Sequence, residues 1–127
     1  MTRYIHSGRP MHTCSTAFGS LELERYPVTG NPTLQAFDTA DVYLLQALSE
    51  QPASDLPVLV INDHFGTLAC ALASAALKHK PHSWCDSELA RLALQSNLAH
   101  NGLAPDAVQF IDSQQLPPGP YRQVLIR

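Results

Sequence analysis

The stretch VLVINDHFGTLACAL, Val58–Leu72, combines an apolar strand, a short turn and the start of a helix rich in small residues. A continuous β-branched run such as residues 58–61 is typical of a strand covered on both faces. Many α/β proteins hold a nucleotide at the turn that follows such a strand. Here the turn contains His64 and Phe65, where such turns normally contain glycine. The stretch therefore indicates an α/β fold and raises the question of whether its turn binds a cofactor.

The alternation of strand and helix continues downstream of this stretch. The expected elements are a helix from about Phe65 to Lys78, a strand at 82–86, a helix at 87–102, and strands at 108–112 and 123–127. Asn101-Gly102 suits a left-handed cap at the end of the second helix. Strands and helices that alternate with such short connections predict a parallel sheet.

The sequence upstream of residue 58 is less regular. Residues 1–20 lack periodicity, so we expect a mobile arm there, followed by one domain over residues 21–127. SLELERY alternates apolar and charged residues, which indicates a short, half-exposed strand. A first helix is expected with Asn31 as its N-cap and Pro32 in its first turn. Its predicted buried face consists of Leu34, Phe37, Leu44, Leu45 and Leu48.

Composition limits the classes of function. The 127 residues, 45% of them apolar, fit one domain with a hydrophobic core. With a net charge of −3, the chain as a whole does not attract nucleic acid electrostatically, so any RNA contact has to come from a local patch of positive charge. No apolar run approaches the ~18 residues of a membrane span, and we see no secretory signal. The three cysteines form no CxxC pair, so we expect free thiols in a cytoplasmic protein without membrane contact.

The turn after residue 61 departs from a cofactor motif. Glycines in such a turn let backbone amides approach the ligand, but Asn62 and His64 stand in their place and only Gly66 remains. Val60 occupies the strand position where an acidic residue often sits. One interpretation is a working cofactor loop. The favoured one is a tight turn closed by its own side chains, His64 and Phe65.

Two acidic residues follow the next two strands, as in a nucleotide site. Asp86 stands where an acid typically binds ribose hydroxyls, and Asp112 where an acid commonly faces the adenine. Each has a structural alternative that we favour. Asp86 or Ser87 can cap the next helix, and Asp112 can open a turn.

Several unusual strings, in the same order, resemble a known family. They are LELERYPVTGNPTLQAFDTADVYLLQAL, VLVINDHFGTLACAL, SWCDSELARLALQSNLAHNGL, VQFIDS and VLIR, from Leu21 to Arg127. These strings resemble the N-terminal half of bacterial rRNA guanine-N2 methyltransferases, foremost the large-subunit RlmG type and then the small-subunit RsmC type. The patterns ND.FG.L.CAL and D.YLLQ.L are the most specific.

The resemblance implies a tandem enzyme. Its C-terminal domain, in the same chain, binds S-adenosylmethionine (SAM) and methylates the exocyclic amine of a guanine. Its N-terminal domain has a similar Rossmann-like fold without the cofactor motif, helps to recognise rRNA and supports the catalytic domain. The family's Asn-Pro-Pro-aromatic motif follows the fourth strand of the C-terminal domain. We therefore expect no catalytic residue in this chain, and only vestigial cofactor positions at Asn62, His64, Gly66, Asp86 and Asp112.

Two other clusters were weighed. His82, Cys85 and Asp86 are the nearest approach to a metal site, but their spacing is unconvincing and no metal is expected. The segment KHKPH gives the only hint of a phosphate-facing surface, although a solvated loop is the commoner explanation. The candidate RNA-binding residues are Lys78, Lys80, Arg91 and Arg122, with Arg127 a further cation elsewhere.

These observations predict a Rossmann-like, three-layer α/β/α fold with a mostly parallel sheet in the order 3-2-1-4 and an accessory N-terminal strand. The leading hypothesis is a non-catalytic, RNA-facing domain that binds no cofactor itself. One alternative is an active SAM-binding methyltransferase domain that uses Gly66, Asp86 and Asp112. Another is an interaction module that forms a homodimer through the open sheet edge at QVLIR.

Overall fold

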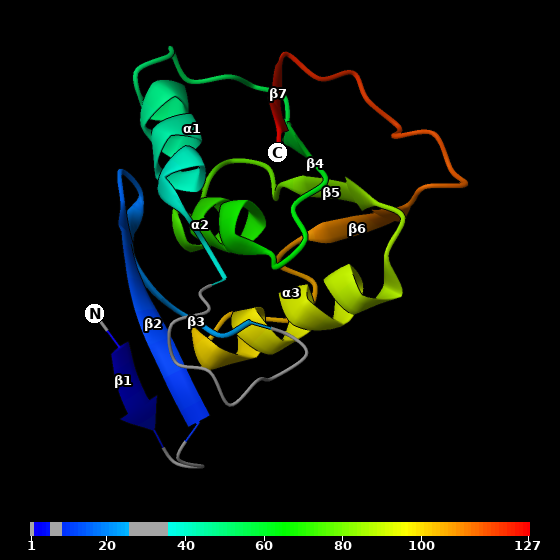
Figure 1. Cartoon of the computed structure of the whole chain (residues 1–127). Helices are drawn as coiled ribbons and strands as arrows, with labels where there is room; N and C mark the ends of the chain where they lie inside the picture. Colours follow the sequence, from blue (N-terminus) through cyan, green and yellow to red (C-terminus); the bar gives the residue numbers. More distant parts are fainter. Residues whose placement is uncertain (1, 6–8, 26–35) are drawn as a thin grey trace.

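The computed structural model describes residues 2–5, 9–25 and 36–127 (Figure 1). These residues form two sheets and three helices. The elements are β1 (Thr2–Ile5), β2 (Arg9–Thr16), β3 (Gly19–Leu23), α1 (Thr39–Ser49), β4 (Val58–Ile61), α2 (Thr67–Ser74), β5 (His82–Cys85), α3 (Glu88–His100), β6 (Gln109–Asp112) and β7 (Gln123–Ile126).

The larger sheet is parallel and has the strand order β6-β5-β4-β7. Leu59 is opposite His82 of β5 on one side and Val124 of β7 on the other. Numbered within this sheet, the order is 3-2-1-4, so the predicted topology is confirmed. The apolar run at residues 58–61 forms the strand expected from it.

The three helices begin at local capping signals. Asp38 caps α1, since its side chain accepts hydrogen bonds from the Ala40 and Asp41 amides and the Asp41 side chain accepts one from the Asp38 amide. The predicted start at Asn31 is therefore wrong for α1, and Asn31 itself lies outside the described residues. Gly66 precedes α2, which ends at Ser74, short of the predicted Lys78.

The C-terminal end of α3 confirms the predicted glycine cap. Gly102 has a φ of +67°. Its amide donates to the Ala99 carbonyl at 3.1 Å, and the Leu103 amide donates to the Leu98 carbonyl at 2.9 Å. This pair of bonds is the Schellman pattern, which satisfies the last carbonyls of the helix.

The N-terminal segment is a regular part of the fold. β2 pairs antiparallel with β1 and β3, and β3 matches the strand predicted in SLELERY. The prediction of an arm without regular structure up to residue 20 is therefore wrong for the described residues. Met11 and Cys14 of β2 are fully buried, because this small sheet packs against the helices.

The helices lie between the two sheets (Figure 1). Val58, Val60 and Leu125 point toward the helices and belong to the main hydrophobic cluster. Their neighbours Val124 and Ile126 point to the opposite face and are 46% and 64% exposed. The connection over residues 113–122 contains no helix. The predicted α/β/α layering is therefore wrong for the described chain, whose layers are parallel sheet, helices and antiparallel sheet.

Asn97 of α3 joins the helix layer to the antiparallel sheet. It is fully buried and accepts a hydrogen bond from the Glu24 amide at 2.8 Å. Its amide group donates to the carbonyls of Glu24 and Phe65 at 3.0 and 2.9 Å. Asn101, one turn later, makes the corresponding two bonds to the backbone of Glu22. No helix among the described residues is long and apolar enough to cross a membrane.

Candidate functional site

The turn at the carboxyl end of β4 is a tight connection to α2. Asn62 has a φ of +62° and Gly66 one of +81°, so both adopt left-handed backbone conformations. A Cβ built on Gly66 would lie 2.8 Å from the Leu94 Cα of α3. The surviving glycine is thus explained by the close approach of two helices and by its own conformation, without a ligand.

A buried carboxylate occupies the N-terminus of α2. Asp63 accepts a hydrogen bond from the Ala69 amide at 2.9 Å and one from the Leu68 amide at 3.3 Å. Burial raises the pKa of Asp63 to about 6, although these two amide bonds lower it. Free amides at a helix N-terminus are a common anion-binding site. In this chain an internal side chain takes that role.

The side chains predicted to close the turn do so only in part. His64 is exposed, whereas Phe65 packs against the hydrophobic cluster and lies 4.9 Å below the Arg25 guanidinium. A cleft of about 350 Å³ remains beside them. Its lining includes Arg25, Phe37, Asp38, Asp41, Asn62, Asp63, His64, Phe65 and Arg127. The expectation that His64 fills the site is therefore wrong.

The far wall of this cleft carries a compensated ion-pair cluster. The Arg127 Nε donates to Asp41 Oδ1 at 2.7 Å, and the same guanidinium donates to Asp38. Asp41 is almost completely buried. Because Asp38 and Asp41 also cap α1, the cluster links the end of β7 to the start of α1. The charges of the cleft are thus largely paired within the protein.

The two other predicted nucleotide positions lie together at the carboxyl ends of β5 and β6. Asp86 and Asp112 both line a shallow cavity of about 360 Å³. Ser87, and not Asp86, caps α3, since its hydroxyl accepts from the Ala90 amide at 3.1 Å. Asp112 accepts from the Gln114 amide at 2.9 Å, so its predicted turn-opening role is confirmed.

The predicted RNA-binding residues lie at opposite ends of the parallel strands. Lys78, Lys80 and Arg122 lie in the connections that lead into β5 and β7, at the amino ends of the strands. Lys78 pairs with Asp55 at 3.1 Å, and both side chains are exposed. Arg91 lies in the first turn of α3, at the carboxyl ends of the strands, where it pairs with Glu88. Three of the four cations therefore lie at the same end of the parallel sheet.

Metal and thiol chemistry find little support here. Within residues 2–5, 9–25 and 36–127, no group of three His, Cys, Asp or Glu side chains is placed to bind a metal. Cys14, Cys70 and Cys85 are free and buried. Burial raises the pKa of each thiol, to about 11 for Cys14. A nucleophilic cysteine needs a lowered pKa.

Comparison with known proteins identifies the family of the chain. The profile of the RLMG N-terminal domain matches residues 11–127. The chain belongs to this family. The match includes most of β2, which the resemblance seen from Leu21 onward did not cover. The resemblance to the large-subunit type of rRNA methyltransferase is confirmed.

Curated relatives carry the name ribosomal RNA large subunit methyltransferase G. The protein of Ectopseudomonas mendocina is 49% identical over 114 residues, which cover 89% of this chain and 30% of the relative. That of Stutzerimonas stutzeri is 48% identical over 119 residues, with 92% and 31% covered. That of Serratia proteamaculans is 50% identical over 108 residues, with 84% and 27% covered. The chain thus spans less than a third of the length of these relatives.

Asp63 is the residue of this RLMG N-terminal domain that sequence reasoning missed. Its role depends on Asn62 and Gly66, whose positive φ values direct the carboxylate back toward the α2 amides. The sequence does carry one signal, because an acid three residues before Gly66 is well placed to reach the first helical turn. The pairing of Arg127 with Asp38 and Asp41 had no local signal.

Proposed function

We propose that this chain is the non-catalytic, rRNA-facing N-terminal domain of a SAM-dependent rRNA guanine-N2 methyltransferase. In this proposal a C-terminal domain of the same longer protein binds SAM, which supplies the methyl group for the exocyclic amine of a guanine. A target base has to leave its stack to reach such a catalyst. The domain described here contributes binding and orientation of the RNA, in the cytoplasm.

The observation that carries the non-catalytic part is the position of Asp63. A nucleotide or SAM site in an α/β sheet uses the turn after the first strand and the helix that follows it. Here the Asp63 carboxylate accepts hydrogen bonds from the Ala69 and Leu68 amides, and Gly66 is packed against α3. A bound cofactor would have to displace a buried side chain and bring its own polar groups beside paired charges.

The RNA-facing part is supported by the family and by charge. The relatives are named as rRNA methyltransferases. Three cations of this chain, Lys78, Lys80 and Arg122, lie at the amino ends of the parallel strands. With a net charge of −3, a local group of this kind is where phosphate contacts would form. Three phosphate contacts to a single strand predict about a 20-fold loss of affinity for a fourfold rise in salt.

Two binding experiments test the two parts of the proposal. Calorimetric titration of the chain with SAM is expected to show no binding, and micromolar affinity would contradict the proposal. Fluorescence anisotropy with labelled rRNA fragments is expected to show salt-dependent binding. Lys80→Ala combined with Arg122→Ala should weaken this binding and flatten its salt dependence. Arg91→Ala, which removes one cation at the carboxyl ends of the strands, is the control and should change RNA binding little. An equal loss of RNA affinity in both variants would contradict the assignment of the RNA contact to the amino ends.

A further inference from the structure

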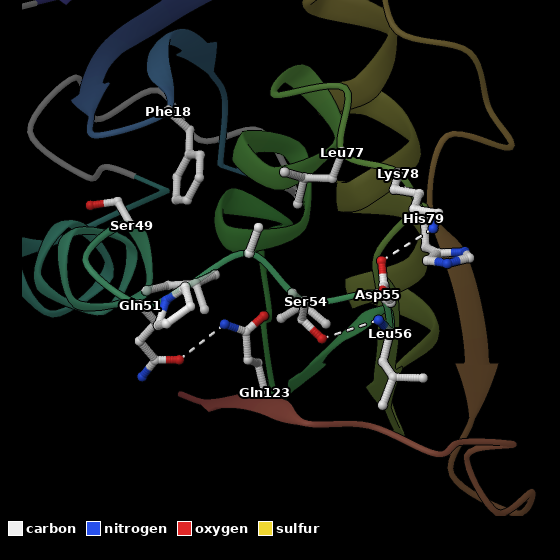
Figure 2. Close-up of a pocket in the computed structure, with 14 residues that line it drawn as sticks. Phe18, Ser49, Gln51, Ser54, Asp55, Leu56, Leu77, Lys78, His79 and Gln123 are labelled. Carbon is white, nitrogen blue, oxygen red and sulfur yellow. Dashed lines mark hydrogen bonds and ion pairs between the residues drawn. The ribbon is translucent and has the colours of Figure 1, made fainter.

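A third cavity lies at the amino-terminal end of the parallel strands (Figure 2). Its volume is about 350 Å³, within the range of small-molecule sites. It is bounded by the β2–β3 turn, the end of α1, the loop over residues 51–57, the start of β7 and the α2–β5 connection. Neither the altered cofactor turn nor Asp86 and Asp112 contribute to it.

Part of the lining of this cavity is apolar and includes the phenyl ring of Phe18. Figure 2 shows Phe18 reaching toward the cavity from the β2–β3 turn and Leu77 doing so from the α2–β5 connection. Leu77 is 42% exposed. The other apolar lining residues are Leu48, Pro52, Ala53, Leu56 and Val58. A flat apolar group could therefore enter between side chains that already present a hydrophobic surface to solvent.

An amide pair supplies polar groups at the same cavity. The Gln123 Nε2 donates to the Gln51 Oε1 at 3.0 Å (Figure 2). With this bond formed, Gln123 still has a carbonyl oxygen to accept with, and Gln51 still has an NH₂ group to donate. Proteins read the edges of unstacked RNA bases with this combination of adjacent donors and acceptors.

The rim of the cavity is cationic where it faces the α2–β5 connection. Lys78 and His79 line the cavity, and Lys80 follows them, all three exposed. Asp55 pairs with Lys78, but exposed ion pairs of this kind contribute little, so a phosphate can replace the carboxylate. The cavity thus offers a ring surface, base-edge partners and phosphate partners within one site.

We propose that this cavity takes up one unstacked nucleobase of single-stranded RNA. Phe18 and Leu77 contact the faces of the base, the Gln51–Gln123 pair bonds its edge, and Lys78 and Lys80 lie near its phosphates. We call the cavity the base pocket. The inference rests on the proposed RNA-facing function and adds a defined nucleotide site to it, remote from the altered cofactor turn.

The test uses a labelled single-stranded RNA of about 12 nucleotides that contains 4-thiouridine. Ultraviolet crosslinking followed by mass spectrometry is expected to identify peptides that contain Phe18 or Leu77. Anisotropy titrations are expected to show about a 10-fold loss of affinity for Phe18→Ala, because base–aromatic stacking is lost. Gln123→Ala should lower the affinity about 5-fold. The matched controls are Tyr43→Ala and Gln109→Ala, which alter an exposed aromatic and an exposed strand glutamine outside the pocket.

Phe18 also packs against the hydrophobic cluster, so Phe18→Leu is included as a variant that keeps apolar volume but lacks the ring. It should remain folded by circular dichroism and still bind RNA more weakly than the parent chain. RNA binding that is equal in the parent, Phe18→Leu and Gln123→Ala, or crosslinks confined to other peptides, would overturn the base pocket while leaving the RNA-facing function intact. If the parent chain binds no RNA at any salt concentration, the proposed function itself fails, and the base pocket with it.

Discussion

Asp63 shows how one side chain can satisfy the free amides of a helix N-terminus, where an anion could otherwise bind. Its two hydrogen bonds satisfy amides that would otherwise point at a ligand, and its burial removes the carboxylate from solvent. The cost is a carboxylate held in a dry environment, which raises its pKa to about 6. The turn is therefore shaped by internal capping and helix packing, with Gly66 serving the latter.

The raised pKa of Asp63 makes the stability of the chain depend on pH. In the unfolded chain an aspartate has a pKa near 3.9, so between about pH 4 and pH 6 the folded state binds the additional proton. The contribution of Asp63 to the free energy of unfolding therefore increases as the pH falls from 7 toward 4, by up to about 3 kcal/mol. Urea unfolding of the parent chain and Asp63→Asn across this range measures it.

The comparison isolates Asp63 because other groups titrate in both proteins. The gap between the two unfolding free energies should widen in favour of the parent chain as the pH falls. Two curves that stay parallel from pH 7 to pH 4 would refute the assignment of this titration to Asp63.

At the scale of elements, the antiparallel sheet depends on polar side chains of a helix. β3 has β2 on one side. Asn101 bonds the amide and carbonyl of Glu22 within β3, and Asn97 bonds those of Glu24, just after the strand. An asparagine side chain presents an NH₂ group that donates and a carbonyl oxygen that accepts, side by side, so it can bond both the carbonyl and the amide of one residue. The position of the β-sheet on α3 is thereby specified.

Asn97→Ala is expected to lower the free energy of unfolding by about 3 kcal/mol, since it leaves three backbone groups without these buried partners. Asn97→Asp keeps an acceptor for the Glu24 amide but cannot donate to either carbonyl, so it should also destabilise the chain. Gln95→Ala, which removes one solvent-exposed hydrogen bond from the same helix to the Pro105 carbonyl, is the control and should change stability little. Thermal and urea unfolding provide the measurement. A loss for Asn97→Ala no larger than that of the control would contradict this role.

An element could be predicted where the residues that determine it lie close together in the sequence. The strands β4 to β7 and the helix α3 were predicted because continuous apolar runs, Ser87 and Gly102 act within a few residues. β2 was missed because its sequence is polar and its structure depends on pairing with other strands. The start of α1 was misplaced because both Asn31 and Asp38 satisfy the capping rule. The site was predicted at its positions but not in its bonds, since Asp63 and Arg127 act through tertiary contacts.

At the scale of the whole molecule, the described fold is one-sided. All described helices lie on one face of the parallel sheet, and the other face presents Val124 and Ile126 to solvent. Parallel sheets usually have both faces covered. Within the described residues β7 pairs only with β4, so its outer edge also has unpaired backbone groups. Both features favour association of this surface with further polypeptide.

We expect the isolated chain to associate with itself through this face; the homodimer alternative predicted from the sequence used the adjacent open edge of β7 instead. Replacement of Val124 and Ile126 by lysine should shift the chain toward the monomer, because two charges would be buried at the contact. Tyr43→Lys is the control, since Tyr43 is 71% exposed and lies on α1, outside the parallel sheet. Sedimentation velocity over a range of concentrations measures the effect. A parent chain that stays monomeric at the highest concentration would rule out this association.

The carboxylate at the start of α2 also limits how this turn can change by mutation. A substitution that removes Asp63 leaves two amides of the helix without their acceptor, so it weakens the fold before any ligand can take the vacated space. Smaller residues in place of Asn62 and His64 would not by themselves empty that position. A ligand site at these amides would thus require several coordinated changes, the first of which would destabilise the chain. The fold therefore protects the capped turn against change by single substitutions.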